Sequence, residues 1–109
     1  MAILINGKDM KDAVIKTEQY EMKIVELIPD SMRVSIKGFD EPFSFVPRFV
    51  TITYPDTKVI SAKDSGIIVV PTGGTVQTTI QFAEKLRLER MMTFELRYAR
   101  KKIADISIE

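Results

Sequence analysis

The residue types that most often carry out chemistry in proteins are scarce in this chain. Its 109 residues include no cysteine and no histidine. Without cysteine there is no thiol nucleophile, no thiolate metal site and no disulfide scaffold. Without histidine the commonest general base and the commonest transition-metal ligand are missing. These two absences exclude Ser-His-Asp hydrolases, Cys-His hydrolases and the usual zinc enzymes.

Three other features contain groups that can react or bind, and each has a plainer interpretation. Pro71–Thr75 contains a glycine pair, but a P-loop needs a lysine after its second glycine, and a strand pattern follows here. Ser61 and Lys63 would form a catalytic pair only if burial removed the charge of the lysine, and this stretch has the composition of a polar turn. Four turn carboxylates are candidate calcium ligands, although no loop has EF-hand spacing; they are Asp40, Glu41, Asp56 and Asp64. We therefore predict no enzyme activity, no catalytic residue, no cofactor and no metal.

Basic side chains gather near the C-terminus, where seven of them face only three glutamates between residues 84 and 102. Such a cluster can bind an acidic partner, a phosphate polymer or a membrane surface. Alternatively it is a solvated face whose charges discourage strand pairing between molecules. The residues that we select as interaction candidates are Arg87, Arg90, Arg97, Arg100, Lys101 and Lys102. If the cluster binds an acidic partner, charge reversal at Arg97 and Arg100 should weaken binding.

Nucleic acid is not expected as a partner. The formal net charge of the whole chain is only +1, whereas nonspecific nucleic-acid binding draws on a strong basic excess. The aromatic residues interspersed in the basic cluster are Phe94 and Tyr98, and both alternate onto the expected core face. Stacking of bases on these rings is therefore poorly supported.

Four phenylalanines fall within eleven residues, at positions 39, 43, 45 and 49. Phe39 and Phe43 are candidates for exposed anchors of a protein interface. Packing in the core is the alternative for both. Met91 and Met92 have the same two interpretations, as an adaptable contact or as gap-filling side chains.

Alternation of apolar and polar residues is the strongest structural signal. It predicts half-buried strands, and the runs are Met32–Lys37, Val50–Tyr54, Val76–Phe82, Phe94–Tyr98 and Asp105–Ile108. Turn residues such as Asn6-Gly7 and Pro55-Asp56 separate the runs. Many short strands punctuated in this way indicate an all-β fold, an antiparallel β-sandwich of about seven to nine strands. Ile67–Val70 is apolar throughout, so we expect it to be buried on both sides.

Two segments are less clear. Lys8–Ile28 fits either a long helical stripe or a turn near Asp9–Asp12 followed by strands near Val14–Lys16 and Tyr20–Ile28, and we favour the strands. Ala83–Met92 has helix-forming residues and a Lys85/Glu89 pair at i,i+4 spacing. We expect it to form one or two helical turns between two late strands.

Length and composition describe one ordinary globular domain covering residues 1–109. The chain is 45% hydrophobic and 28% charged, and at this length it can bury a core without disulfides. The N-terminus lacks a basic region followed by a long apolar run, so we expect no signal peptide, and no stretch is apolar enough to span a bilayer. A cytoplasmic or virion location follows, or an extracytoplasmic one if a leader was removed.

The stretch from about Met32 to the end resembles the bacterial telokin-like, immunoglobulin-like sandwich domains. The first matching piece is Arg33–Phe45 with its Asp-Glu-Pro-Phe turn, followed by Phe49–Val59. The second piece consists of Ile68–Val76, Thr79–Phe82 and Phe94–Tyr98. The resemblance implies an immunoglobulin-like sandwich fold in a family that is mostly of unknown function. It supplies no catalytic residues.

The expected function is a non-catalytic protein-interaction or structural module of bacterial or mobile-element origin. Its contact surface would be the open edge of a sheet or the loops at one end, its partner a protein, and a homo-oligomer is an open alternative. A second interpretation is a structural component of a bacteriophage virion, such as a tail or head-decoration subunit. The small size, the missing cysteines, the missing leader and the opening Ile3–Asp9 favour this alternative. Native mass would separate the two, because a ring or trimer favours the virion component.

Overall fold

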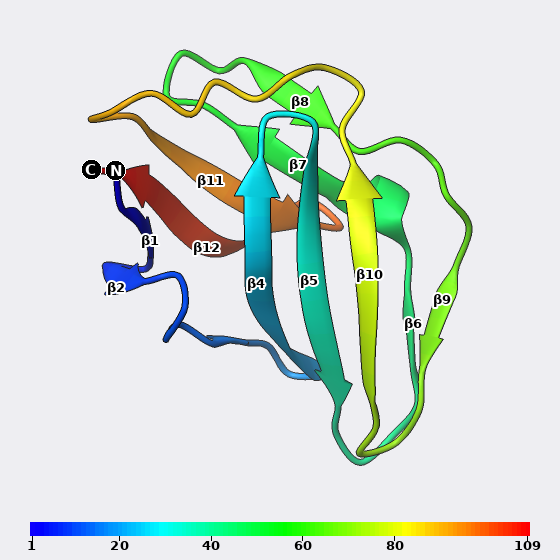
Figure 1. Ribbon diagram of the computed structural model, residues 1–109. Helices are drawn as coiled ribbons and strands as arrows, with labels where there is room; N and C mark the ends of the chain where they lie inside the picture. The colour runs from blue at the N-terminus through cyan, green and yellow to red at the C-terminus, as the bar shows by residue number, and fades with distance from the viewer.

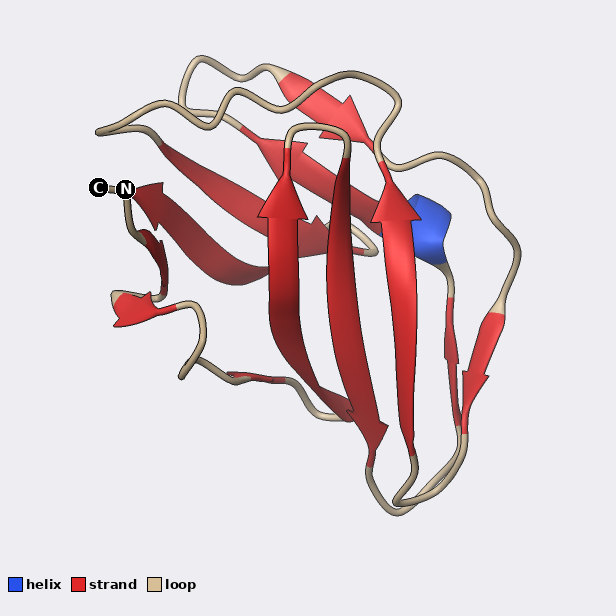
Figure 2. Cartoon of the chain, viewed as in Figure 1, coloured by secondary structure: helices blue, strands red, loops and turns tan.

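The computed structural model describes all residues 1–109 as an antiparallel all-β sandwich (Figures 1 and 2). One layer is a six-stranded sheet with the order β2-β1-β12-β11-β7-β8. Its strands are β1 (Ile3–Ile5), β2 (Lys8–Asp9), β7 (Val50–Thr53), β8 (Val59–Ser61), β11 (Thr93–Tyr98) and β12 (Lys101–Ile108). The expected fold class is confirmed.

The other layer is a four-stranded sheet with the order β10-β5-β4-β3. Its strands are β3 (Ile15–Lys16), β4 (Tyr20–Ile28), β5 (Ser31–Gly38) and β10 (Thr75–Gln81). A separate two-stranded ribbon pairs β6 (Phe43–Phe45) with β9 (Ile68–Val70), and Figure 1 shows it beside β10 at one margin of the sandwich. The only helix is one short 3-10 turn, η1 (Pro47–Phe49), so no helix of this chain is long and apolar enough to cross a lipid bilayer.

Strand order and crossovers give the sandwich its immunoglobulin-like character. The chain passes from the β4–β5 hairpin to β7 in the opposite sheet, returns for β10, and crosses again to β11 and β12. Strands A, B and E of an immunoglobulin sandwich share one sheet, while C, F and G share the other. In this chain β4, β5 and β10 take the first set of positions, and β7, β11 and β12 take the second. Twelve strands are formed instead of seven to nine, because six short segments of two or three residues also pair, four of them in the two sheets and two as the separate ribbon.

The core lies between the two sheets, and the alternating residues fill it. In β5 the side chains of Met32, Val34 and Ile36 are completely buried, while Arg33 and Lys37, which alternate with them, face solvent. One continuous cluster of 26 buried hydrophobic residues joins both layers. Because each inward side chain removes apolar surface from water, this burial supplies the main driving force for the fold.

The ambiguous N-terminal segment forms strands, as favoured, and not a long helix. A turn covers Met10–Asp12, and β3 and β4 begin within a residue of the expected positions. Residues Ile15 and Met22 pair directly across β3 and β4, and both are buried. This cross-strand pairing satisfies the backbone of a segment whose apolar residues would also suit a helix.

The expectation of a helix at Ala83–Met92 is wrong, because the segment is an irregular crossover. Its backbone donors bond to other parts of the chain, where a helix would use carbonyls four residues back. The N–H of Ala83 donates to the carbonyl of Ser61 at 2.8 Å, and that of Leu86 donates to the carbonyl of Pro29 at 2.8 Å. The Leu86 side chain is buried in the core, which fixes the crossover against the sandwich.

The expectation that Ile67–Val70 is buried on both sides is also wrong. Val70 is fully buried, but Ile67 and Val69 are 66% and 63% exposed. The reason is that β9 pairs only with β6, in a ribbon that has one face against the core. In Figures 1 and 2 β9 is the outermost strand on that side of the molecule.

Candidate interaction surfaces

An aromatic cluster lies between the two layers, near the end of the sandwich that carries the loop between β5 and β6, which we call the loop end. The ring of Tyr20 stacks on that of Phe43 with centroids 4.7 Å apart, and Phe45 stacks on Tyr98 at 4.9 Å. Phe43 is only 9% exposed, so its ring is part of the core in this structure. Of the two aromatic candidates from the sequence, Phe39 is the one that is partly exposed.

The two tyrosines of this cluster differ in how their hydroxyl groups are satisfied. The hydroxyl of Tyr98 accepts a hydrogen bond from the backbone N–H of Val46 at 2.8 Å. The hydroxyl of Tyr20 is buried and has no hydrogen-bond partner. Burial raises the pKa of both phenols above the ordinary value of 10, and the rise is larger for Tyr20. A buried hydroxyl without a partner costs free energy that an apolar side chain would not.

Replacing Tyr20 with phenylalanine is therefore expected to raise the free energy of unfolding by about 1 kcal/mol. Above the pKa of about 10 that an unfolded tyrosine has, the unfolded state loses a proton that the folded state keeps. Stability must therefore fall as the pH rises through this range. The Tyr20→Phe variant should show a shallower alkaline decline, which urea titrations at pH 7 and at about pH 11 would measure.

Tyr98→Phe is the matched control, because it removes a hydroxyl that has a partner. It should lower the free energy of unfolding by about 1 kcal/mol, since the N–H of Val46 loses its acceptor. Equal effects in the two variants would show that the missing partner of Tyr20 has no energetic consequence.

The structure divides the basic cluster into two groups. Arg87 and Arg90 lie in the crossover before β11, whereas Arg100, Lys101 and Lys102 follow the end of that strand. Arg87 lies over the ring of Tyr54 at 4.6 Å, and its guanidinium is 3.4 Å from the carboxylate of Asp56. The hydroxyl of Tyr54 also accepts from the N–H of Arg87 at 2.9 Å and donates to its carbonyl at 3.0 Å. These contacts give Arg87 a structural role in fixing the crossover.

Arg97 belongs to the second group, at the tight hairpin between β11 and β12. Ala99 and Arg100 form this turn with φ values of 50° and 68°, a left-handed conformation that usually selects glycine or asparagine. The Arg97 guanidinium bonds to the carboxylate of Glu95 at 2.8 Å and to the carbonyl of Arg100 at 2.7 Å. These two bonds of Arg97 stabilise the turn. The side chain of Arg100, by contrast, is exposed and forms no ion pair.

The 3-10 turn η1, which contains Arg48, lies beside this hairpin. The N–H of Ala99 donates to the carbonyl of Phe49 at 3.0 Å, which brings the turn next to η1. Together they enclose a shallow hollow of about 600 Å³, which we call the arginine hollow; its lining residues are Arg48, Phe49, Thr51, Val59, Arg97, Ala99 and Arg100. Phe49 is 41% exposed and Val59 is 48% exposed, so the hollow combines apolar side chains with three arginines.

Arg48 was not among the residues selected from the sequence. It lies far from the C-terminal cluster along the chain and reaches it only because β7 pairs with β11, with Thr51 directly opposite Arg97. The alternation after Phe49 predicts that a strand begins there. No feature of the sequence identifies the partner of that strand.

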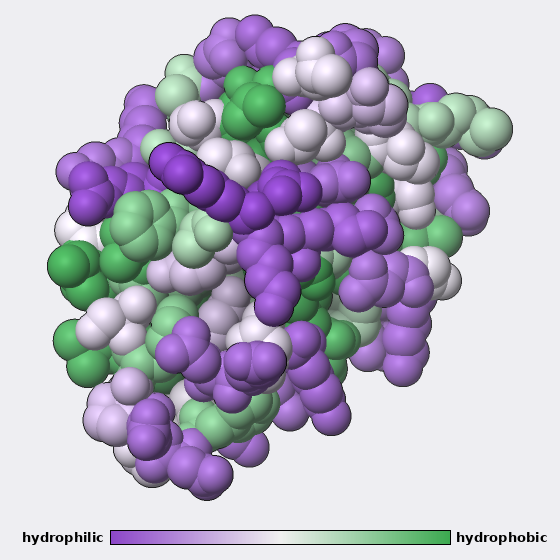
Figure 3. All heavy atoms as spheres, turned by 180° about the vertical axis from the view of Figure 1, so that it is seen from behind, coloured by the Kyte–Doolittle hydropathy of each residue, from purple (hydrophilic) through white to green (hydrophobic).

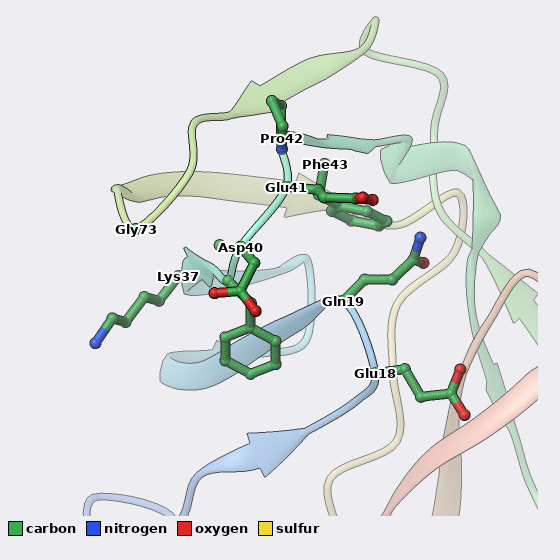
Figure 4. Close-up of a pocket in the computed structure, with 10 residues that line it drawn as sticks. Glu18, Gln19, Lys37, Asp40, Glu41, Pro42, Phe43 and Gly73 are labelled. Carbon is green, nitrogen blue, oxygen red and sulfur yellow. The ribbon is translucent and has the colours of Figure 1, made fainter.

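A hollow of opposite charge lies at the loop end of the sandwich (Figure 4). It has a volume of about 610 Å³, and side chains from the loop between β5 and β6 and the turn between β3 and β4 line it. Asp40, Glu41 and Glu18 are its carboxylates, and Lys37 is its only cation. None of these four residues forms an ion pair within the chain. We call residues Phe39–Pro42 the acidic loop.

The remaining surface carries apolar side chains in separate places. Apart from the N-terminal Met1, the most exposed hydrophobic side chains are those of Met91, which is 87% exposed, Ile67 and Val69. Met92, by contrast, packs partly buried against the core. Seen from behind, the molecule has small hydrophobic patches between hydrophilic side chains (Figure 3). Lys101 and Lys102 are exposed, and Lys102 pairs with Asp105 at 3.2 Å.

The structure brings no group of three or more acidic side chains into an arrangement that could hold a metal ion. The four turn carboxylates that the sequence offers as candidate calcium ligands belong to no such group. Asp56 instead faces Arg87, and hydrogen bonding from the N–H of Lys58 and the nearby Arg87 charge lower the pKa of its carboxyl group.

The fold and these surfaces define an antiparallel immunoglobulin-like sandwich with one basic and one acidic hollow. A scan against protein-family models, a search of curated proteins and a search of solved structures found no match for this chain. Function is therefore inferred from the surfaces of the molecule.

Proposed function

We propose that this chain is a non-catalytic protein-interaction module that binds acidic segments of a protein partner at the arginine hollow. The observation that supports the proposal is the pair of exposed arginines without an acidic partner, Arg48 and Arg100, beside the half-exposed Phe49 and Val59. The resemblance of Met32 onward to bacterial telokin-like domains supports a bacterial or mobile-element origin.

The composition of the arginine hollow fits a protein partner. Arginine and aromatic residues are enriched at protein interfaces and at the positions that contribute most to affinity. The guanidinium group offers several donors in a planar fork that suits carboxylates. Arg97 is held by Glu95 and by the turn carbonyl, so that one wall of the hollow is ordered before a partner arrives. Such preorganisation lowers the entropic cost of binding.

The proposal predicts salt-sensitive binding of an acidic peptide. A fluorescein-labelled octaglutamate should bind at low ionic strength, and the double variant Arg48→Glu/Arg100→Glu should weaken binding about tenfold or more. These two residues are the right ones to change, because neither has an ion pair in the folded chain. Fluorescence anisotropy titrations at several salt concentrations would measure the effect.

Lys23→Glu/Arg33→Glu is the matched control. Both residues are exposed on the opposite sheet without an ion pair, and their reversal changes the net charge by the same amount. If binding depends on the arginine hollow, the control should retain affinity within about twofold. An equal loss in both double variants would mean that only net charge matters and would refute the site.

A further inference from the structure

The acidic loop is complementary to the arginine hollow in charge and in apolar character. Asp40 and Glu41 are exposed at its tip, with the partly exposed Phe39 beside them. The arginine hollow presents Arg48 and Arg100 around Phe49. Carboxylates facing guanidinium groups and one aromatic ring facing another are contacts that stabilise protein interfaces.

Within one molecule, the charges of the acidic loop and those of the arginine hollow do not pair with each other. The hollows share no lining residue, and no ion pair joins Asp40, Glu41 or Glu18 to an arginine. The chain as a whole has a net charge of only +1, so copies do not repel each other strongly. Opposite charges held on separate surfaces of a nearly neutral molecule favour contact between copies.

We propose that the arginine hollow of one copy receives the acidic loop of a second copy. This inference rests on the arginine hollow being the binding surface in the proposed function, and it names the partner. The contact joins two different surfaces, so it is heterologous, and repetition produces a ring if the rotation closes and a chain of copies if it does not. The half-exposed Phe49 gives the contact an apolar centre, which the surrounding ion pairs orient.

Two charge-reversed variants of the full chain test the proposal. Arg48→Glu/Arg100→Glu reverses the hollow, and Asp40→Lys/Glu41→Lys reverses the loop. Wild-type protein should self-associate in sedimentation velocity runs at about 0.05 M NaCl and dissociate at about 0.5 M. Each variant alone should remain monomeric, because its two surfaces now carry the same sign.

Mixing the two variants in equal amounts is the decisive measurement. Association should return, because the unaltered acidic loop of the hollow variant can enter the unaltered arginine hollow of the loop variant. The reversed hollow and the reversed loop also carry opposite charges in this mixture. The Lys23→Glu/Arg33→Glu protein should associate like the wild type. Circular dichroism would confirm folding of each variant, and all six substituted residues are exposed and form no ion pair.

Three outcomes would overturn the inference: a monomeric wild type at all concentrations, variants that associate as the wild type does, or a mixture that stays monomeric. If the octaglutamate titration still depends on Arg48 and Arg100 in that case, the proposed function stands without self-association. Loss of both effects would refute both proposals. A closed ring in native mass spectra would support self-association and would favour the virion component over a monomeric module.

Discussion

Replacing Phe45 with alanine is expected to lower the free energy of unfolding by about 3–5 kcal/mol, which is a large part of the total stability of a domain of this size. The ring is completely buried. It stacks on Tyr98 at 4.9 Å and meets Tyr20 edge-on at 6.3 Å. Truncation therefore removes both the transfer free energy of the ring and its aromatic contacts, and it leaves a cavity between the sheets.

Urea denaturation, with the midpoint and slope fitted together, would measure this loss. Phe49→Ala is the matched control, because Phe49 also contacts Tyr98 at 6.0 Å but is 41% exposed. Its truncation should cost about 1 kcal/mol. If the two variants lost a similar amount of unfolding free energy, the burial of Phe45 in the core and the exposure of Phe49 at its margin would be contradicted. Phe45→Leu should recover most of the stability, because it refills much of the cavity.

Replacing Gly38 with alanine is expected to lower the free energy of unfolding by about 1–3 kcal/mol. A Cβ atom at this position would lie 2.6 Å from the carbonyl oxygen of Pro71 and 3.3 Å from a methyl group of Val70. The first obstacle is backbone, which a side-chain rotation cannot move aside. The residue is glycine because the end of β5 passes directly against the turn between β9 and β10.

This prediction concerns packing and not backbone conformation, since Gly38 does not have a positive φ. Ser35→Ala on the same strand is the control, at a half-buried position, and should change stability by less than about 0.5 kcal/mol. Thermal unfolding of both variants would compare them directly. If Gly38→Ala is as stable as Ser35→Ala, the close approach of β5 to Pro71 is not maintained in solution. The acidic loop starts at the next residue, so its position depends on this approach.

Most of the strands could be predicted from the sequence. Period-two alternation depends only on the side chains of one strand, since one face meets the core and the other meets water. That is why β5, β7, β10 and β11 lie where the alternation placed them; it also located the second half of β12, which begins four residues earlier, at Lys101. The N-terminal strands followed from the same rule, supported by the Pro29-Asp30 turn before β5.

The errors occurred where the partners of a segment decide its structure. Ala83–Met92 has helix-forming residues, but Leu86 is buried and its N–H bonds to Pro29, which no local pattern encodes. Ile67–Val70 looks like a central strand because it is apolar, yet it pairs with one strand only and leaves Val69 exposed. Propensity and hydrophobicity are local quantities, and tertiary contacts override them.

The candidate site shows the same division. The basic residues from Arg97 to Lys102 could be found by counting charges; in the structure Arg100, Lys101 and Lys102 are exposed and Arg97 is partly buried. Their association with Arg48 and Phe49, and the separation of Arg87 from them, depend on the pairing of β7 with β11. Arg87 looked like one more free cation, but its stacking on Tyr54 makes it part of the scaffold.

The sequence by itself determined the all-β class, the faces of the long strands and the absence of thiol and imidazole chemistry, because each follows from residue identity and nearest neighbours. The tertiary structure alone decided which distant residues share a surface. Strand pairing between residues far apart in the chain created the arginine hollow and held the acidic loop apart from it. Such pairing is selected by the packing of the whole core, and no short stretch of sequence contains that information.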